Sequence, residues 1–116
     1  MTGLAPDGGL LLPEKLPGIG TRLDDWKNLS YQELAFEVMS LFTTDMPAED
    51  LKALIDKSYS TFRAPDVAPV VPVGNLNILE LWHGPTAAFK DVALQIMPLS
   101  FCRENWSNMV RGQKFS

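Results

Sequence analysis

The sequence predicts an α/β protein in which two helices precede a strand, a tight loop and a final helix. Three observations predict it: a helix-start signal at Ser30, a strand-like run at 77–82, and a Gly-Pro loop directly after that run. The chain has 116 residues, of which 46% are hydrophobic and 21% charged. This size and composition indicate one packed domain at most.

The first predicted helix covers residues 31–43 and begins after Ser30. Ser30 and Glu33 have the spacing of a capping box, in which a hydroxyl and a carboxylate bind backbone N–H groups at the helix start. Four apolar residues at offsets of 0, 4, 7 and 8 then share one helical face: Leu34, Val38, Leu41 and Phe42.

The second predicted helix covers residues 47–60. Pro47 suits its first turn, where a missing N–H costs nothing, and Glu49 and Asp50 suit the positive end of the helix dipole. Its expected buried stripe consists of Leu51, Leu54, Ile55 and Phe62. Both helices are interpreted as scaffold.

The remaining elements follow a proline-containing connector at 66–72. Residues 77–82 are predicted to form a strand with apolar side chains on both faces, as in a sheet covered on two sides. A loop at 83–86 leads to a last helix from about Ala87 toward Leu99, in which Thr86 is expected to be the N-cap.

Composition excludes several classes of function. The net charge of −4 argues against a nucleic-acid partner, and no apolar run reaches the ~20 residues that span a bilayer. One cysteine, Cys102, and the absence of a visible secretory signal predict a cytoplasmic protein without disulfides. With a single histidine, His83, a metal site is not expected.

Lys90 is the residue whose placement suggests chemistry. A lysine in the first turn of a helix is unfavourable by roughly 0.3–1 kcal/mol, because the helix dipole opposes the ammonium charge. The same field favours a neutral, nucleophilic amine, and Phe89 could add an apolar wall beside it. The alternative is a solvated surface lysine whose charge is offset by Asp91. Placement alone leaves both interpretations open.

Two segments resemble the threonine synthase family. Residues 80–91 read ELWHGPTAAFKD, which is similar to the family segment Glu-Leu-aromatic-His-Gly-Pro-Thr-X-X-Phe-Lys-Asp. Residues 2–14, TGLAPDGGLLLPE, resemble the N-terminal segment of the same family. The resemblance implies that Lys90 is the catalytic and cofactor-binding lysine, which holds pyridoxal 5′-phosphate covalently.

The resemblance also implies a fold and a reaction. The family converts O-phospho-L-homoserine and water to L-threonine and phosphate, in a fold type II architecture related to the β subunit of tryptophan synthase. Residues 1–76 would then be the N-terminal segment and residues 77–99 the start of the cofactor-binding domain. His83 could orient phosphate or hold a turn, and Trp82 is expected to pack beside the site. The oligomeric state is not implied.

Residues 100–116 depart from the family pattern. Residues 1–100 carry 7 basic and 13 acidic side chains, whereas residues 101–116 carry 3 basic and 1 acidic. A truncated or frame-shifted end and a genuine short protein are both open. After Lys90 the chain has one glycine, Gly112, and no loop of the kind that cradles a cofactor phosphate. We therefore expect this chain alone to be inactive; the alternative is a non-catalytic helical module that docks on a partner or a full-length homologue.

Overall fold

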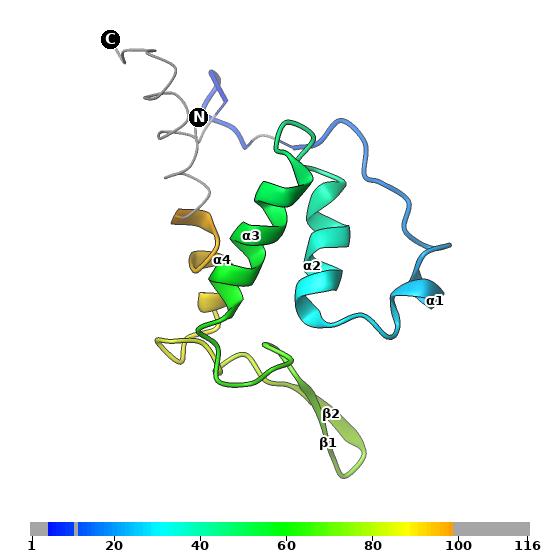
Figure 1. Ribbon diagram of the computed structural model, residues 1–116, viewed down its shortest axis with the longest axis vertical. Helices are drawn as coiled ribbons and strands as arrows, with labels where there is room; N and C mark the ends of the chain where they lie inside the picture. The colour runs from blue at the N-terminus through cyan, green and yellow to red at the C-terminus, as the bar shows by residue number, and fades with distance from the viewer. Residues whose placement is uncertain (1–4, 11, 99–116) are drawn as a thin grey trace.

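The computed structural model describes residues 5–10 and 12–98 (Figure 1). Within these ranges it is a small mixed segment of four helices and one two-stranded antiparallel hairpin. The elements are α1 (Leu23–Trp26), α2 (Tyr31–Ser40), α3 (Ala48–Tyr59), β1 (Val70–Val73), β2 (Leu76–Leu79) and α4 (Asp91–Leu94). The single turn of α1 was not predicted from the sequence.

The start of α2 confirms the predicted capping box. The Ser30 N–H donates to Glu33 Oε2 at 2.8 Å, and the Glu33 N–H donates to Ser30 Oγ at 3.3 Å. The Ser30 N–H and the Ser30 hydroxyl, which donates to Glu33 Oε2 at 2.7 Å, hold the pKa of the Glu33 carboxyl below its ordinary 4.5, because both bonds favour the ionised form. The helix ends at Ser40, earlier than expected, and tighter turns follow it: the Phe42 N–H donates to the Met39 carbonyl at 3.0 Å.

Helix α3 supplies most of the core. Leu51, Leu54 and Ile55 are buried as predicted, and Ile55 is fully inaccessible, whereas Phe62 is only partly buried at the edge of the core. The core cluster consists of Leu51, Leu54, Ile55, Tyr59, Val67 and Ile96. Four of these six residues lie on α3, and the other two, Val67 and Ile96, follow it in the chain.

Helix α2 lies alongside α3 (Figure 1). The side chains of α2 that pack on the core are Tyr31, Ala35, Phe36 and Met39, all partly buried. The apolar face that the sequence pattern singled out is a different one, since Val38 and Phe42 are 37% and 50% exposed. Helix α2 therefore has apolar side chains on two sides, and α3 covers one of them.

The region after α3 corrects the predicted strand. Instead of one strand at 77–82, β1 pairs antiparallel with β2 in a hairpin with Val73 opposite Leu76. Gly74, with φ of 62°, begins the two-residue Gly-Asn turn, a hairpin signal that the sequence analysis missed. We expected this strand to be covered on two sides, but all four residues of β2 are exposed. In Figure 1 the hairpin projects away from the helices.

Helix α4 is shorter than the predicted helix from 87 toward 99. Ala87 has φ of 59°, a left-handed conformation that cannot continue into a right-handed helix, so α4 begins at Asp91. The Tyr59 hydroxyl donates to the Val92 carbonyl at 2.9 Å and thereby joins α4 to α3. Residues 99–116, including the divergent tail, lie outside the described residues.

Candidate functional site

The loop between β2 and α4 carries the sequence-predicted site. In its first half, His83 Nε2 lies 2.6 Å from Glu80 Oε2, and both side chains are 21% exposed. The His83 carbonyl accepts the Arg63 N–H at 2.9 Å, and its ring lies 5.6 Å from that of Trp82. The structure therefore places His83 where it holds the turn, with Trp82 packed beside it.

In the second half of the loop, contacts converge on the Asp91 carboxylate. It accepts the Thr86 N–H at 2.8 Å, the Thr86 hydroxyl at 2.9 Å and the Gln95 side-chain N–H at 3.2 Å. The sequence predicted Thr86 as the N-cap of α4, and this prediction is wrong. The N-cap is Lys90, which makes no side-chain capping bond. Sequence spacing gave no signal for a contact across five residues between Thr86 and Asp91.

Asp91 is a buried charge, since the residue is 2% exposed. Burial by itself would raise the pKa of its carboxyl, but the hydrogen bonds from Thr86, Gln95 and the Ala88 backbone outweigh that effect and lower the pKa below its ordinary 3.8. The side chain is consequently ionised at neutral pH, and hydrogen-bond donors rather than a cation satisfy it.

Lys90 has the opposite environment from its neighbour. The residue is exposed, and its Nζ lies 5.9 Å from the centre of the Phe89 ring. Phe89 is itself 64% exposed, so it does not enclose the amine as the sequence analysis expected. Lys90 also precedes α4 instead of lying in its first turn.

The Lys90 amine is open to solvent. In the described part of the chain it forms no ion pair, and Asp91, which was expected to offset its charge in the alternative interpretation, is bound to Thr86 instead. An exposed amine without a carboxylate partner fits covalent attachment to an aldehyde cofactor. The described residues thus include an amine that could hold the cofactor. The sequence after Lys90 contains no glycine-rich loop that could bind the cofactor phosphate.

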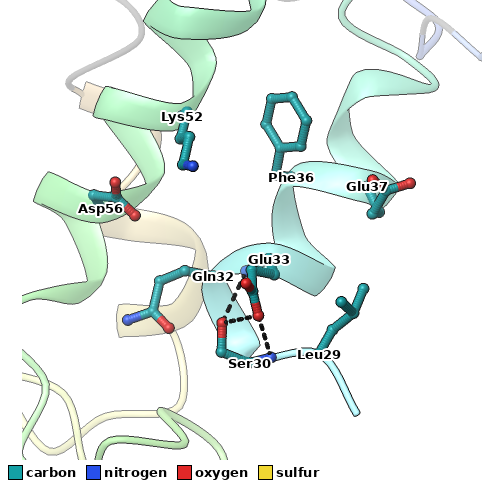
Figure 2. Close-up of a pocket in the computed structure, with 8 residues that line it drawn as sticks. All are labelled: Leu29, Ser30, Gln32, Glu33, Phe36, Glu37, Lys52 and Asp56. Atoms are coloured by element: carbon teal, nitrogen blue, oxygen red, sulfur yellow. Dashed lines mark hydrogen bonds between the residues drawn. The ribbon is translucent and has the colours of Figure 1, made fainter. Parts of the chain in front are cut away.

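Two surface depressions lie on the helical part. An apolar groove of about 470 Å³ lies between α2, α3 and α4. It is lined by Tyr31, Leu34, Ala35, Val38, Met39, Tyr59, Val92, Ala93, Ile96 and Met97. A polar depression of about 510 Å³ lies at the start of α2, over the capping box (Figure 2). Lys90 lines neither of them.

The described residues hold neither a metal cluster nor a membrane span. No group of three or more His, Cys, Asp or Glu side chains among them could hold a metal ion. None of the helices in residues 5–10 and 12–98 has the length and apolar character needed to cross a bilayer.

Comparison with known proteins identifies the family of the chain. The family profile of the threonine synthase N terminus matches residues 1–59. Threonine synthase of Schizosaccharomyces pombe is 50% identical over 101 residues, an alignment that covers 84% of this chain and 20% of the relative.

Solved structures give the same result. The crystal structure of threonine synthase from yeast superposes with a TM-score of 0.80 at 46% identity, covering 96% of this chain and 24% of the yeast chain. Threonine synthase from Brucella melitensis, solved with pyridoxal phosphate bound, superposes with a TM-score of 0.79 at 38% identity, covering 89% of this chain and 24% of that one. The chain therefore spans about a quarter of those structures, and it belongs to the threonine synthase family as its N-terminal region.

Proposed function

We propose that this chain is the N-terminal part of a pyridoxal-phosphate-dependent threonine synthase and that Lys90 is its cofactor-binding and catalytic lysine. The observation that carries the proposal is the exposed amine of Lys90, at the end of a family-like loop, which has no ion-pair partner among residues 5–10 and 12–98. The substrate would be O-phospho-L-homoserine, and the products L-threonine and phosphate. Residues 77–99 would begin the cofactor-binding domain of a fold type II enzyme, and residues 1–76 the segment before it.

The chemistry divides between the cofactor and this chain. Pyridoxal phosphate, when bound, supplies an electron sink that stabilises negative charge on substrate carbon atoms. Lys90 would hold the cofactor through Nζ, and the same amine in its neutral form can accept and return a proton. Glu80 and His83 would fix the loop on one side of the lysine, since their side chains are bound to each other.

This chain alone is expected to be inactive. It spans 20–24% of the length of the relatives and structures that it matches, and its described residues contribute an amine without a phosphate site. Incubation with O-phosphohomoserine and cofactor should therefore release no phosphate. Turnover by the isolated chain that disappears in Lys90→Ala would contradict this expectation.

The lysine assignment is testable in a completed enzyme. We would join residues 1–97 to the remaining part of S. cerevisiae threonine synthase, which is 46% identical to this chain. Borohydride reduction and peptide mapping should find the cofactor on Lys90, and Lys90→Arg should abolish activity, because guanidinium stays protonated at any usable pH. Lys52→Arg and Lys57→Arg, on the exposed side of α3, are the matched controls and should retain activity. A label on another lysine would contradict the assignment.

A second candidate function is a docking module, and the apolar groove between α2, α3 and α4 favours it. The proposed occupant is the remainder of a threonine synthase chain, because the matched structures extend over about four times the length of this segment. Val38, 37% exposed in the groove, offers a test. The separately expressed remainder should co-elute with this chain in size-exclusion chromatography, and Val38→Glu should prevent it. Co-elution without the visible absorbance of the bound cofactor would favour docking over catalysis.

A further inference from the structure

Asp91 and Lys90 are adjacent residues with opposite surroundings. Asp91 is 2% exposed and ionised, whereas Lys90 is exposed and unpaired within the described residues. Aspartates are rarely buried to this extent unless they have specific partners. The partners here are the backbone and side chain of Thr86 and the amide of Gln95, so the carboxylate links the loop to α4.

The shape of the loop depends on this carboxylate. A Cβ atom added to Gly84 would collide with the Asp91 side chain and would lie 2.7 Å from its Cγ, so the loop backbone passes directly over the carboxylate. Ala87 is held in the left-handed region, which costs a non-glycine residue of order 1–3 kcal/mol and persists only where surrounding contacts impose it. We call Gly84, Thr86, Asp91 and Gln95 the Asp91 network.

Backbone hydrogen bonds also hold the chain on both sides of Lys90. The Asp91 N–H donates to the Ala88 carbonyl at 3.0 Å, and the Lys90 carbonyl accepts the Leu94 N–H at 2.8 Å. The Asp91 side chain is turned into the loop and buried, whereas the adjacent Lys90 side chain is exposed. The Asp91 network therefore ties the loop before Lys90 to the residues that follow it in and after α4.

We propose that Asp91 is a positioning residue. Its carboxylate binds Thr86 on the other side of the loop, beneath Gly84, and thereby orients Lys90. The proposal rests on the proposed function, because orientation matters only if the Lys90 amine is the reacting group. A misplacement of about 1 Å of such a group can lower the rate about 100-fold without removing it. The Asp91 network would thus fix the position of the Lys90 amine without taking part in its reaction.

The first test uses the chain as it is and needs no cofactor. Amide hydrogen exchange measured by NMR should show protection of the Thr86 N–H, and Asp91→Ala should accelerate that exchange at least ~10-fold, the factor for losing about 1.4 kcal/mol of protection. Asp91→Asn keeps the size of the side chain and one oxygen for the Thr86 N–H, but its amide NH2 replaces the oxygen that accepts from the Thr86 hydroxyl and Gln95, so it should give a smaller acceleration. Thr86→Ser keeps both donors and should preserve protection. Asp45→Ala, an exposed aspartate elsewhere, is the matched control and should change nothing at Thr86.

The second test uses the completed enzyme described above. Asp91→Ala should lower kcat about 100-fold. Borohydride reduction and peptide mapping should still find as much cofactor on Lys90 as in the enzyme without the substitution. Thr86→Ser should keep most of the rate that Thr86→Val loses. Unchanged Thr86 exchange, or unchanged kcat, in Asp91→Ala would overturn the positioning role while leaving the lysine assignment intact. A cofactor bound to another lysine would overturn the proposed function, and the positioning role would fall with it although the Thr86 exchange result still held.

Discussion

The pair of helices α2 and α3 and the loop from Glu80 to Asp91 are held together in different ways. The helices are joined by apolar contacts around Ile55, and the start of α2 is fixed by a capping box between residues three apart. The loop contributes few buried apolar side chains, and its shape is set by the carboxylates of Glu80 and Asp91. The first region depends on buried area, and the second on a few polar groups that must all find partners.

This difference predicts different responses to substitution. Apolar packing loses stability in proportion to the volume removed, so damage to the helices should be graded and global. A buried polar network loses most of its value when one partner is removed, because the remaining groups are left without hydrogen bonds. Damage to the loop should accordingly be abrupt and local.

The largest expected effect is in the core. Ile55→Ala removes three carbon atoms from a fully buried side chain and should lower the free energy of unfolding by about 3 kcal/mol. Leu79→Ala in the exposed hairpin, where the side chain is 54% accessible, is the matched control and should cost less than about 0.5 kcal/mol. Urea denaturation followed by far-UV circular dichroism measures both. Equal losses would show that the hairpin belongs to the same core.

The next effect concerns the link between α3 and α4. Tyr59→Phe removes the hydrogen bond to the Val92 carbonyl and should cost about 1.5 kcal/mol, because the loss of this bond loosens the contact between α3 and α4. Burial, together with the nearby Tyr31, raises the pKa of Tyr59 above its ordinary 10. Wild-type stability should therefore be fully present below pH 10 and fall as the pH rises above it.

Tyr59→Phe should weaken this alkaline dependence without abolishing it, since burial also raises the pKa of Tyr31. Denaturation at pH 8 and pH 11 measures the difference. An unchanged alkaline slope in the variant would contradict the buried position of the Tyr59 hydroxyl.

A smaller effect is expected at the start of α2. Ser30→Ala removes the capping hydroxyl and should cost about 1 kcal/mol of stability. Ser40→Ala, at the other end of the same helix, removes a hydroxyl bonded only to the Glu37 carbonyl and should change stability by less than about 0.5 kcal/mol. Thermal unfolding of the two variants compares them directly, and a larger effect at Ser40 would be inconsistent with the cap.

The smallest effect is confined to acid. The pKa values of Glu33 and Asp91 lie below their ordinary 4.5 and 3.8, so both carboxylates stabilise the fold above those values and lose that contribution as the pH falls through the lower folded pKa. Asp91→Asn should flatten the loop part of this loss, read from Thr86 amide exchange between pH 5 and pH 2.5. Glu33→Gln, which removes the titrating carboxyl, should flatten the helical part, read from the dichroism at 222 nm. A single shared transition would mean that the two regions unfold together.

The helices could be predicted from the sequence because their signals are local. The capping box at Ser30 and the stripe of Leu51, Leu54 and Ile55 depend on spacings within two turns. The face of α2 that meets α3 was not evident, because both sides of that helix are apolar and only tertiary contacts select one. The hairpin was missed although Gly74-Asn75 is a local signal, since Pro69 and Pro72 pointed to a connector.

At the candidate site, the sequence singled out Lys90 through a family resemblance but misjudged its surroundings. Phe89 is exposed and does not enclose the Lys90 amine, and Thr86 binds Asp91 instead of capping a helix. These features accompany the left-handed conformation of Ala87, which cannot be predicted from an alanine in a sequence. The burial of Asp91 beside an exposed lysine follows from that backbone and could be found only in three dimensions.

The two-stranded hairpin also has a consequence for handling the protein. Among the described residues, β1 and β2 form a sheet of two strands, so each strand has one side on which its backbone groups lack a strand partner. Such edges are templates for pairing with other chains, and Val70, Leu76 and Leu79 add exposed apolar side chains to them. Pro72 removes one donor from β1, whereas every residue of β2 keeps its N–H. Intermolecular strand addition at high concentration should therefore begin along Leu76–Leu79, and a charged residue in place of Asn77 would protect that edge.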